Sequence, residues 1–110
     1  MTTFKVLSYN VLADCLAKIK KDDNLYMKFN VRFAKIKAEI LKADADIVAL
    51  QECDHFDEQY IPMLKHAGYY PFNCERKHTS LDDAMRSSLV IGYKRQVFEY
   101  VDQEVLDFDM

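Results

Sequence analysis

One stretch of the chain, residues 44–52, constrains the fold more than any other. It reads Asp-Ala-Asp-Ile-Val-Ala-Leu-Gln-Glu, so a short apolar run ends abruptly in an amide and a carboxylate. A run of this length, rich in aliphatic and β-branched residues, predicts a buried strand. Residues 47–50 show no polar alternation, which is typical of a strand covered on both faces, as in parallel α/β sheets. Such a strand would carry Glu52 out of its carboxyl end.

An earlier run, residues 4–10, has the same form and ends in the amide of Asn10. Between the two runs, apolar residues recur at alternating spacings of four and three, the pattern of an amphipathic helix laid on a sheet: Phe29, Phe33, Ile36 and Ile40. Asn30 is a candidate N-cap for this helix. The order strand, helix, strand predicts a β-α-β unit with a right-handed crossover.

Parallel strands in such a unit place Asn10 and Glu52 at the same edge of the sheet. Open α/β sheets bind their ligands there, outside the carboxyl ends of the strands. An ordinary alternative stays open for each residue. A glutamate at a strand end is often a solvated or capping residue, and Asn10 could be a turn residue that bonds its own backbone.

The second part of the chain predicts one more helix and three more strands. Apolar spacing indicates a helix over residues 56–67, closed by Gly68 and either beginning near Pro62 or kinked there. Residues 69–72 are aromatic enough for a strand, which Pro71 demotes to an edge. A loop follows at 76–83, and residues 88–93 and 97–106 predict an antiparallel hairpin. This order indicates an α/β fold with a mixed sheet.

Length and composition exclude several classes of protein. A chain of 110 residues, half of them hydrophobic, makes one domain with a modest core. The apolar runs are too short for a membrane span and the first residues lack the layout of a signal peptide, so a cytoplasmic protein is expected, with nucleus and mitochondrion as alternatives. Residues 1–42 carry nine Lys and Arg against four acids, and residues 43–110 carry six against fourteen. Solvated helix surfaces are the usual cause, and no basic nucleic-acid arm is present.

The cysteines and histidines do not form a recognisable metal or disulfide pattern. The three cysteines are widely spaced without a Cys-x-x-Cys pair, which favours buried or idle thiols: Cys15, Cys53 and Cys74. The histidines also lack ligand spacing: His55, His66 and His78.

Two motifs carry a resemblance to a known family. Residues 7–14 read Leu-Ser-Tyr-Asn-Val-Leu-Ala-Asp, and together with residues 44–52 they resemble the paired motifs of the endonuclease/exonuclease/phosphatase superfamily, in particular its deadenylase, nocturnin and angel-like branch. Residues 32–40, 54–56, 62–69 and 88–98 are also similar to that branch. The chain departs from the branch at Ser87-Ser88, where an Asp-Gly pair is usual, and it has no counterpart of the family's later Asp-x-Asn and terminal histidine motifs.

The resemblance implies a fold and an activity. Residues 1–110 would form a single partial domain, the N-terminal half of a four-layer α/β sandwich with helices packed on a mixed sheet, its C-terminal half absent. The implied activity is magnesium-dependent phosphodiester hydrolysis, specifically a 3′-5′ exoribonuclease of the poly(A) deadenylase type. A nucleotide phosphatase of the same superfamily and a non-catalytic relic acting as a binding module are the alternatives. The chain alone is expected to be inactive.

The resemblance also implies roles for individual residues. Glu52 matches the carboxylate that binds the catalytic Mg²⁺, with Mn²⁺ as an alternative ion, and Asn10 matches the amide beside it. Arg76 falls near a family lysine that reaches substrate phosphate. The implied partners are RNA or a nucleotide phosphate ester, with no membrane. Self-association is also expected, or else a missing C-terminal half that covers the uncovered sheet face.

Overall fold

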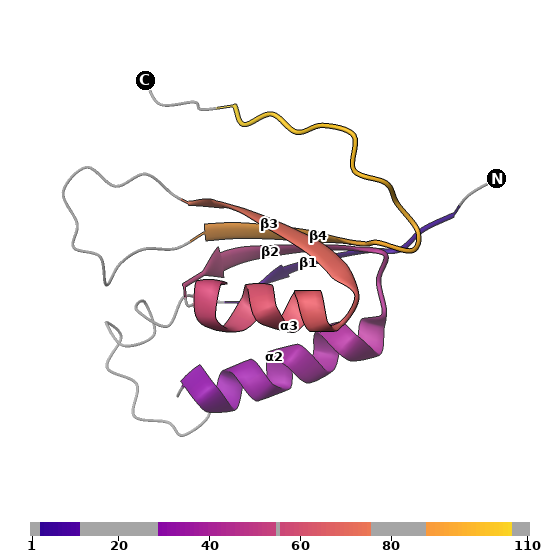
Figure 1. The fold of residues 1–110 in the computed structure, drawn as a ribbon. Coiled ribbons are helices and arrows are strands. Elements are labelled where there is room, and N and C mark those ends of the chain that lie inside the picture. Colours follow the sequence, from indigo (N-terminus) through magenta and orange to yellow (C-terminus); the bar gives the residue numbers. More distant parts are fainter. Residues whose placement is uncertain (1–2, 12–28, 55, 76–87, 107–110) are drawn as a thin grey trace.

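A computed structural model of the chain describes residues 3–11, 29–54, 56–75 and 88–106 (Figure 1). Within these ranges the elements follow in the order β1 (Val6–Asn10), α2 (Phe29–Ala43), β2 (Ile47–Cys53), the π-helical turn η2 (Phe56–Tyr60), α3 (Ile61–His66), β3 (Tyr69–Glu75) and β4 (Ser88–Lys94). The predicted loop at 76–83 lies outside these residues. None of the described helices has the length and apolar character needed to cross a membrane.

The four described strands form one mixed sheet in the order β1-β2-β4-β3. β1 runs parallel to β2, with Asn10 opposite Gln51, whereas β4 is antiparallel to both β2 and β3. A parallel pair needs a long crossover, and α2 lies within it. The predicted β-α-β unit and mixed sheet are therefore confirmed, and β3, which contains Pro71, is an edge strand as predicted.

Both helices cover the same face of the sheet (Figure 1). Alternate residues of the central strands point into this layer, where Val48, Leu50 and Val90 are fully buried against Ile40 and Leu64. The prediction that residues 47–50 are covered on both faces is therefore only half right. Their other side chains, Ile47 and Ala49, are half-buried, because α2 and α3 leave the second face uncovered.

The helix α2 begins at Phe29, one residue before its predicted N-cap. Asn30 is thus inside the helix, and its Oδ1 accepts a hydrogen bond from the Val31 amide at 3.1 Å. Ile36 and Ile40 are buried as the spacing predicts, and the Phe33 ring packs edge-on against Tyr60 with ring centres 5.2 Å apart. This aromatic contact joins α2 to the second helical segment.

The second helical segment starts as a π-helical turn and continues as α3, with Pro62 as the second residue of α3. A proline is tolerated in the first turn because the amide there has no partner within the helix. The prediction that the ordered helix begins near Pro62 is confirmed. Gly68 follows with φ of 97°, the left-handed conformation expected of a residue that ends a helix.

The predicted strand at residues 97–106 is wrong. Both edges of β4 are already occupied, one by β2 and the other by β3, so the chain leaving β4 has no edge with which to form a hairpin. It turns at residues 95–97 and continues without secondary structure on the uncovered side of the sheet (Figure 1). Phe98 contacts Phe4, with ring centres 5.5 Å apart, and Tyr100 contacts Tyr70 at 5.9 Å.

Candidate functional site

Asn10 and Glu52 lie together at the carboxyl edge of the parallel pair. Asn10 is the last residue of β1, and Glu52 is the residue before the end of β2. The Asn10 Nδ2 donates a hydrogen bond to Glu52 Oε2 at 2.5 Å. The predicted proximity of the two residues, which are separated by 42 positions in the sequence, is confirmed.

The backbone at Glu52 is unusual. Its φ is 58°, and the pairing between β2 and β4 shifts register between Leu50 and Cys53. A bulge of this kind inserts a residue outside the regular ladder and turns its side chain away from the strand's alternation. A non-glycine residue in the left-handed region costs about 1 kcal/mol, and such residues are concentrated at functional sites. The bulge therefore aims Glu52 toward Asn10, a feature that sequence patterns did not predict.

Gln51 fixes the strand just before this bulge. Its Nε2 donates to the Oγ of Ser8 at 3.1 Å and to the carbonyl of Ala49 at 3.2 Å. The bond to Ser8 ties β2 to β1 on the face opposite the helices, and the bond to Ala49 holds the Gln51 side chain against its own strand. The pair Asn10–Glu52 is thus supported by Gln51, which precedes Glu52, and by Ser8, two residues before Asn10.

A second support comes from α2 beneath the site. Val11, the residue after Asn10, is buried and donates its amide to the Gln51 carbonyl at 3.0 Å. Its own carbonyl accepts a hydrogen bond from Arg32 Nη1 at 2.7 Å. Sequence reasoning missed Arg32. The available signal was a charged residue on the apolar stripe of α2, three residues after Phe29 and four before Ile36.

Two titratable groups near the site are held neutral at neutral pH. A hydrogen bond to Glu39, together with burial, raises the pKa of Tyr9 to about 12. Burial, and to a smaller extent the charge of Asp54, raises the pKa of the Cys53 thiol to about 12. Because the thiolate is the nucleophilic form of cysteine, Cys53 is a core residue and not a nucleophile.

The chemistry of the pair suits a hard cation. Glu52 supplies carboxylate oxygens and Asn10 an amide, and Mg²⁺ commonly takes one or two protein carboxylates with water and phosphate oxygens completing its shell. Across the part of the chain that the structure describes, no cluster of three or more His, Cys, Asp or Glu could hold a metal by itself. The residues present therefore fit one part of such a site. Arg76, the predicted phosphate contact, lies outside the described residues.

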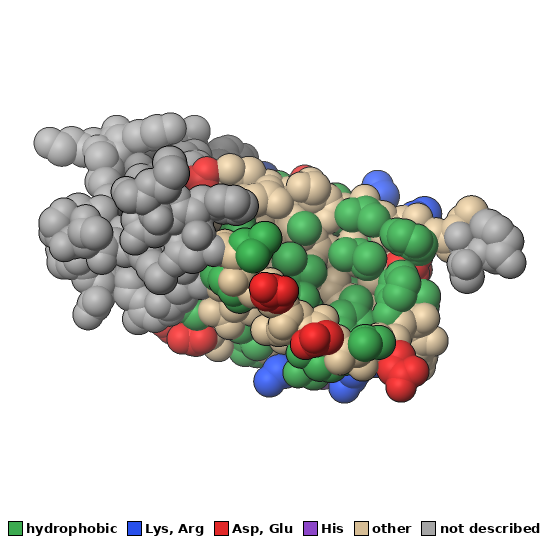
Figure 2. Space-filling view, turned by 90° about the horizontal axis from the view of Figure 1, so that it is seen from above, with side chains coloured by type: hydrophobic (Ala, Val, Ile, Leu, Met, Phe, Trp, Pro, Cys, Tyr) green, Lys and Arg blue, Asp and Glu red, His purple; other side chains and the backbone are tan. Residues whose placement is uncertain are grey.

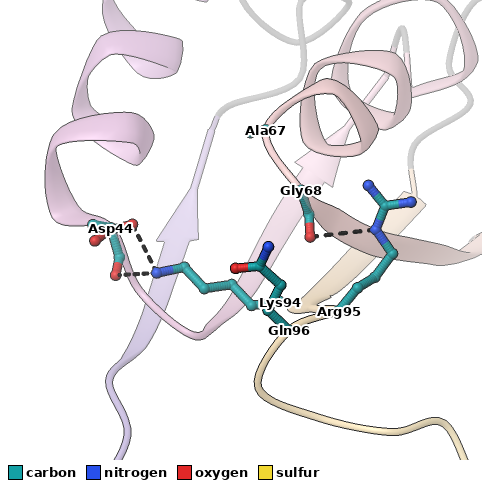
Figure 3. Close-up of a pocket in the computed structure, with 6 residues that line it drawn as sticks. All are labelled: Asp44, Ala67, Gly68, Lys94, Arg95 and Gln96. Carbon is teal, nitrogen blue, oxygen red and sulfur yellow. Dashed lines mark hydrogen bonds and ion pairs between the residues drawn. The ribbon is translucent and has the colours of Figure 1, made fainter.

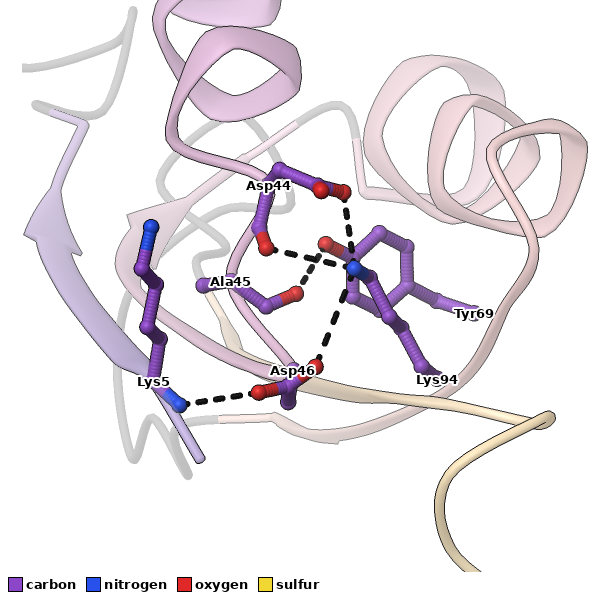
Figure 4. A network of polar contacts seen from close by, with 6 residues as sticks. All are labelled: Lys5, Asp44, Ala45, Asp46, Tyr69 and Lys94. Atoms are coloured by element: carbon purple, nitrogen blue, oxygen red, sulfur yellow. Dashed lines mark hydrogen bonds and ion pairs between the residues drawn. The ribbon is translucent and has the colours of Figure 1, made fainter. Parts of the chain in front are cut away.

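A pocket of about 470 Å³ lies at the opposite end of the sheet, lined by Asp44, Ala67, Gly68, Lys94, Arg95 and Gln96 (Figure 3). Two of its charged residues, Asp44 and Lys94, form an ion pair, and Arg95 Nε donates to the Gly68 carbonyl at 3.5 Å. Lys94 Nζ lies 2.7 Å from Asp44 Oδ1 and 3.7 Å from Asp46 Oδ1. Figure 4 shows Lys5 and Tyr69 joining the same network, through bonds to Asp46 and to the Ala45 carbonyl. This end of the sheet is a structural junction between α2, β2 and β4.

The fold and the site together define a layered α/β protein whose mixed sheet carries helices on one face and a carboxylate–amide pair at its carboxyl edge. The sequence profile of the Endonuclease/Exonuclease/phosphatase family matches residues 7–110. The chain belongs to this family, and the predicted resemblance is confirmed.

Relatives from the predicted deadenylase branch support this assignment. The chain is 30% identical over 115 residues to the CCR4-Not complex 3′-5′-exoribonuclease subunit Ccr4 of Saccharomyces cerevisiae, an alignment that covers 96% of this chain and 14% of that protein. It is 37% identical over 73 residues to Nocturnin of Xenopus laevis, covering 61% of this chain and 18% of the relative. The chain therefore spans less than a fifth of either relative.

Two solved structures share the fold. A structure of ANGEL2, described as a 2′,3′-cyclic phosphatase, superposes with a TM-score of 0.76 at 26% identity, covering 90% of this chain and 29% of that one. The human Nocturnin catalytic domain superposes with a TM-score of 0.76 at 23% identity, covering 90% and 35% respectively. The predicted fold class, an α/β sandwich with helices on a mixed sheet, is confirmed.

Proposed function

We propose that this chain supplies the first half-site of a metal-dependent phosphodiesterase. The observation that carries the proposal is the Asn10–Glu52 hydrogen bond at the carboxyl edge of β1 and β2. Glu52 is held there in a left-handed conformation that ordinary strand geometry would not produce. Such a local cost is typical of a functional position.

The two residues have different roles in this proposal. Glu52 would hold Mg²⁺ or Mn²⁺ through a carboxylate oxygen, and the bound ion would polarise a phosphoryl oxygen of the substrate. Asn10 donates to Glu52 Oε2, so it orients the carboxylate and leaves the other oxygen to the ion. Neither residue accepts a proton from the nucleophile in this scheme, so the base must come from another part of the site.

The proposed substrate is the 3′ end of RNA, cut as a 3′-5′ exoribonuclease of the deadenylase type. The name of the Saccharomyces cerevisiae relative supports this choice. A phosphatase acting on a nucleotide phosphate ester is the second candidate, which the description of ANGEL2 supports. A non-catalytic binding module is the third, because the described residues contain no cluster that could hold a metal by itself.

The metal role of Glu52 is tested first on the chain itself. Carboxylate and carbonyl oxygens also suit Mn²⁺, whose paramagnetism broadens nearby amide NMR signals. We expect weak Mn²⁺ binding that broadens signals at Asn10 and Glu52 and disappears in Glu52→Gln, which preserves shape but removes the charge. Asp44→Asn removes an acid from the opposite end of the sheet and is the matched control. Broadening centred on Asp44 and Asp46, unchanged in Glu52→Gln, would contradict the assignment.

The catalytic role needs the rest of the site. A chimera in which this chain replaces the matching segment of the nocturnin catalytic domain provides it, once thermal melting shows that the chimera folds. We expect hydrolysis of oligoadenylate that falls at least a hundredfold, about 3 kcal/mol of barrier, in Glu52→Gln. Asp44→Asn in the same chimera should leave the rate unchanged. Equal rates in the unsubstituted chimera, its Glu52→Gln variant and its Asp44→Asn variant would show that Glu52 takes no part in the chemistry.

The chain alone should not turn over substrate. Groups that act as a unit lose most of their joint effect when one is missing, and the described residues offer one metal-binding carboxylate and one amide. The assay uses oligoadenylate and RNA ending in a 2′,3′-cyclic phosphate, each with Mg²⁺. Multiple turnovers on either substrate would show that the half-site interpretation is wrong and would also identify the preferred ester.

A further inference from the structure

Arg32 is a charged residue on the apolar side of α2. Its side chain is half-buried, and its guanidinium lies 6.0 Å from the centre of the Phe29 ring. Removing a guanidinium from water costs free energy, so a half-buried one is retained only where it has well-placed acceptors. One such acceptor is the Val11 carbonyl, which receives the Nη1 hydrogen at 2.7 Å.

Val11 joins β1 to β2 next to the Asn10–Glu52 pair. It is buried, and its amide donates to the Gln51 carbonyl at 3.0 Å. Val11 follows Asn10 directly, and Gln51 precedes Glu52 directly. Each of the two site residues is therefore one peptide unit away from a hydrogen bond made by Val11.

Asn10 and Glu52 depend on the hydrogen bonds of Val11 because the regular pairing of the sheet ends at these two residues. The last paired position of β1 is Asn10, and the β2–β4 register is interrupted between Leu50 and Cys53, where Glu52 lies. The Asn10–Glu52 hydrogen bond is short and joins two side chains that the sheet exposes. A displacement of the chain at Val11 would separate the two groups.

We propose that Arg32 is a positioning residue for the Asn10–Glu52 pair. Its guanidinium holds the Val11 carbonyl, which sets where β1 ends and hence where the Asn10 amide meets the Glu52 carboxylate. The importance of this arrangement for catalysis rests on the proposed function. The positioning itself is a property of the chain and can be measured without metal or substrate.

The experiment compares Arg32→Met with Lys37→Met, which removes the same charge from an exposed position of the same helix. The readouts are the NMR signals of the Asn10 side-chain amide and the hydrogen exchange of the Val11 amide. In Arg32→Met we expect the Asn10 signals to move toward those of a solvated amide. Exchange at Val11 should accelerate about tenfold, the factor that corresponds to one lost hydrogen bond to a charged donor. Exchange at Val48 and Val90 in the core should stay within about twofold of the wild type.

Arg32→Lys provides the conservative replacement. An ammonium can still donate one hydrogen bond to the Val11 carbonyl, so this variant should recover most of the Val11 protection. It also keeps the test valid if Arg32→Met does not fold. Lys37→Met should match the wild type in every readout.

Two outcomes would overturn the proposal. One is an unchanged Asn10 signal and unchanged Val11 exchange in Arg32→Met. The other is a uniform loss of protection that includes Val90, which would make Arg32 a general stabilising residue. Failure of the proposed function has a different signature. The broadening of amide signals by Mn²⁺ would then be the same in Glu52→Gln as in the wild type, while the Asn10 and Val11 readouts in Arg32→Met would still change as expected.

Discussion

Glu52 combines two properties that are seldom found in one strand residue. Its backbone has φ of 58°, and its carboxylate accepts a hydrogen bond from a residue of the neighbouring strand. Regular alternation would send the side chain at this position to one face of the sheet. The bulge instead brings its carboxylate to the Asn10 side chain at the end of β1. The local conformation therefore decides the direction in which the charge points.

Substitution of Asn10 should affect catalytic turnover more than the stability of the fold. Its side chain is exposed, so Asn10→Ala should lower the free energy of unfolding by about 1 kcal/mol or less, as measured by urea denaturation. In the nocturnin chimera the same substitution should reduce turnover, because the Glu52 carboxylate loses its orienting donor. A large loss of stability with full turnover would identify Asn10 as a structural turn residue.

Cys53 should be inert to thiol reagents at neutral pH. Burial raises the pKa of its thiol to about 12 and shields the sulfur from reagents, so it should react far more slowly than the exposed Cys74. The comparison uses Cys15→Ser/Cys74→Ser, which keeps Cys53, and Cys15→Ser/Cys53→Ala, which keeps Cys74. Similar rates in the two variants would contradict the burial of Cys53.

The same pKa shift predicts how stability depends on pH. The folded state binds the Cys53 proton more tightly than the unfolded state. The contribution of this bound proton to the free energy of unfolding is complete below the ordinary thiol pKa of 9.0. It is lost as the pH rises from 9.0 toward 12. Urea unfolding should therefore show a steeper loss of stability in this interval for the wild type than for Cys53→Ala. Equal dependence of stability on pH in the two proteins would show that the pKa of the Cys53 thiol is not raised.

At the scale of the elements, the end of α3 depends on the backbone conformation of one residue, Gly68. Gly68 has φ of 97°, and a Cβ built on it would meet no atom within 4 Å. Gly68→Ala should therefore cost about 1 kcal/mol through the backbone alone, without a steric clash. Asn tolerates the left-handed region better, so Gly68→Asn should lose less. Thermal melting of the three proteins checks this order, and an unchanged melting temperature in Gly68→Ala would contradict it.

Local elements were predictable from the sequence wherever periodicity and chain order were sufficient. The spacing of Ile36 and Ile40 indicated the buried face of α2, and the rule for parallel strands placed Asn10 beside Glu52. The strand predicted at 97–106 failed because its composition favours β structure, whereas strand pairing is decided by β3, which occupies the free edge of β4. The Glu52 bulge and the Arg32 contact with Val11 were also missed, since both depend on atoms that are distant in sequence.

At the scale of the whole molecule, the uncovered sheet face is the dominant feature. Figure 2 shows apolar side chains gathered on this side. The outward-pointing residues include Val6, Leu89 and Ile91, which are 58%, 51% and 37% exposed. An exposed apolar surface of this kind usually marks an interface.

The chain should therefore self-associate when no partner covers this face. Light scattering across a dilution series should give a mass above that of the monomer at high concentration. Leu89→Thr combined with Ile91→Thr should restore the monomer, because threonine keeps the strand propensity and adds a polar group. Leu41→Thr changes an exposed apolar residue of α2, on the other side of the sheet, and should not alter the mass. A monomer at every concentration would contradict the prediction.

The strand order also has a consequence for synthesis. Within the described sheet β3 pairs only with β4, yet β3 leaves the ribosome first, and β4 must then insert between β3 and β2. A nascent chain that ends before Ser88 can assemble β1, α2 and β2, while β3 still lacks its partner. The emergence of residues 88–94 from the ribosome thus sets the moment at which β4 can pair with both β2 and β3. Until that moment the backbone donors and acceptors along β2 and β3 are open to other nascent chains on the same message.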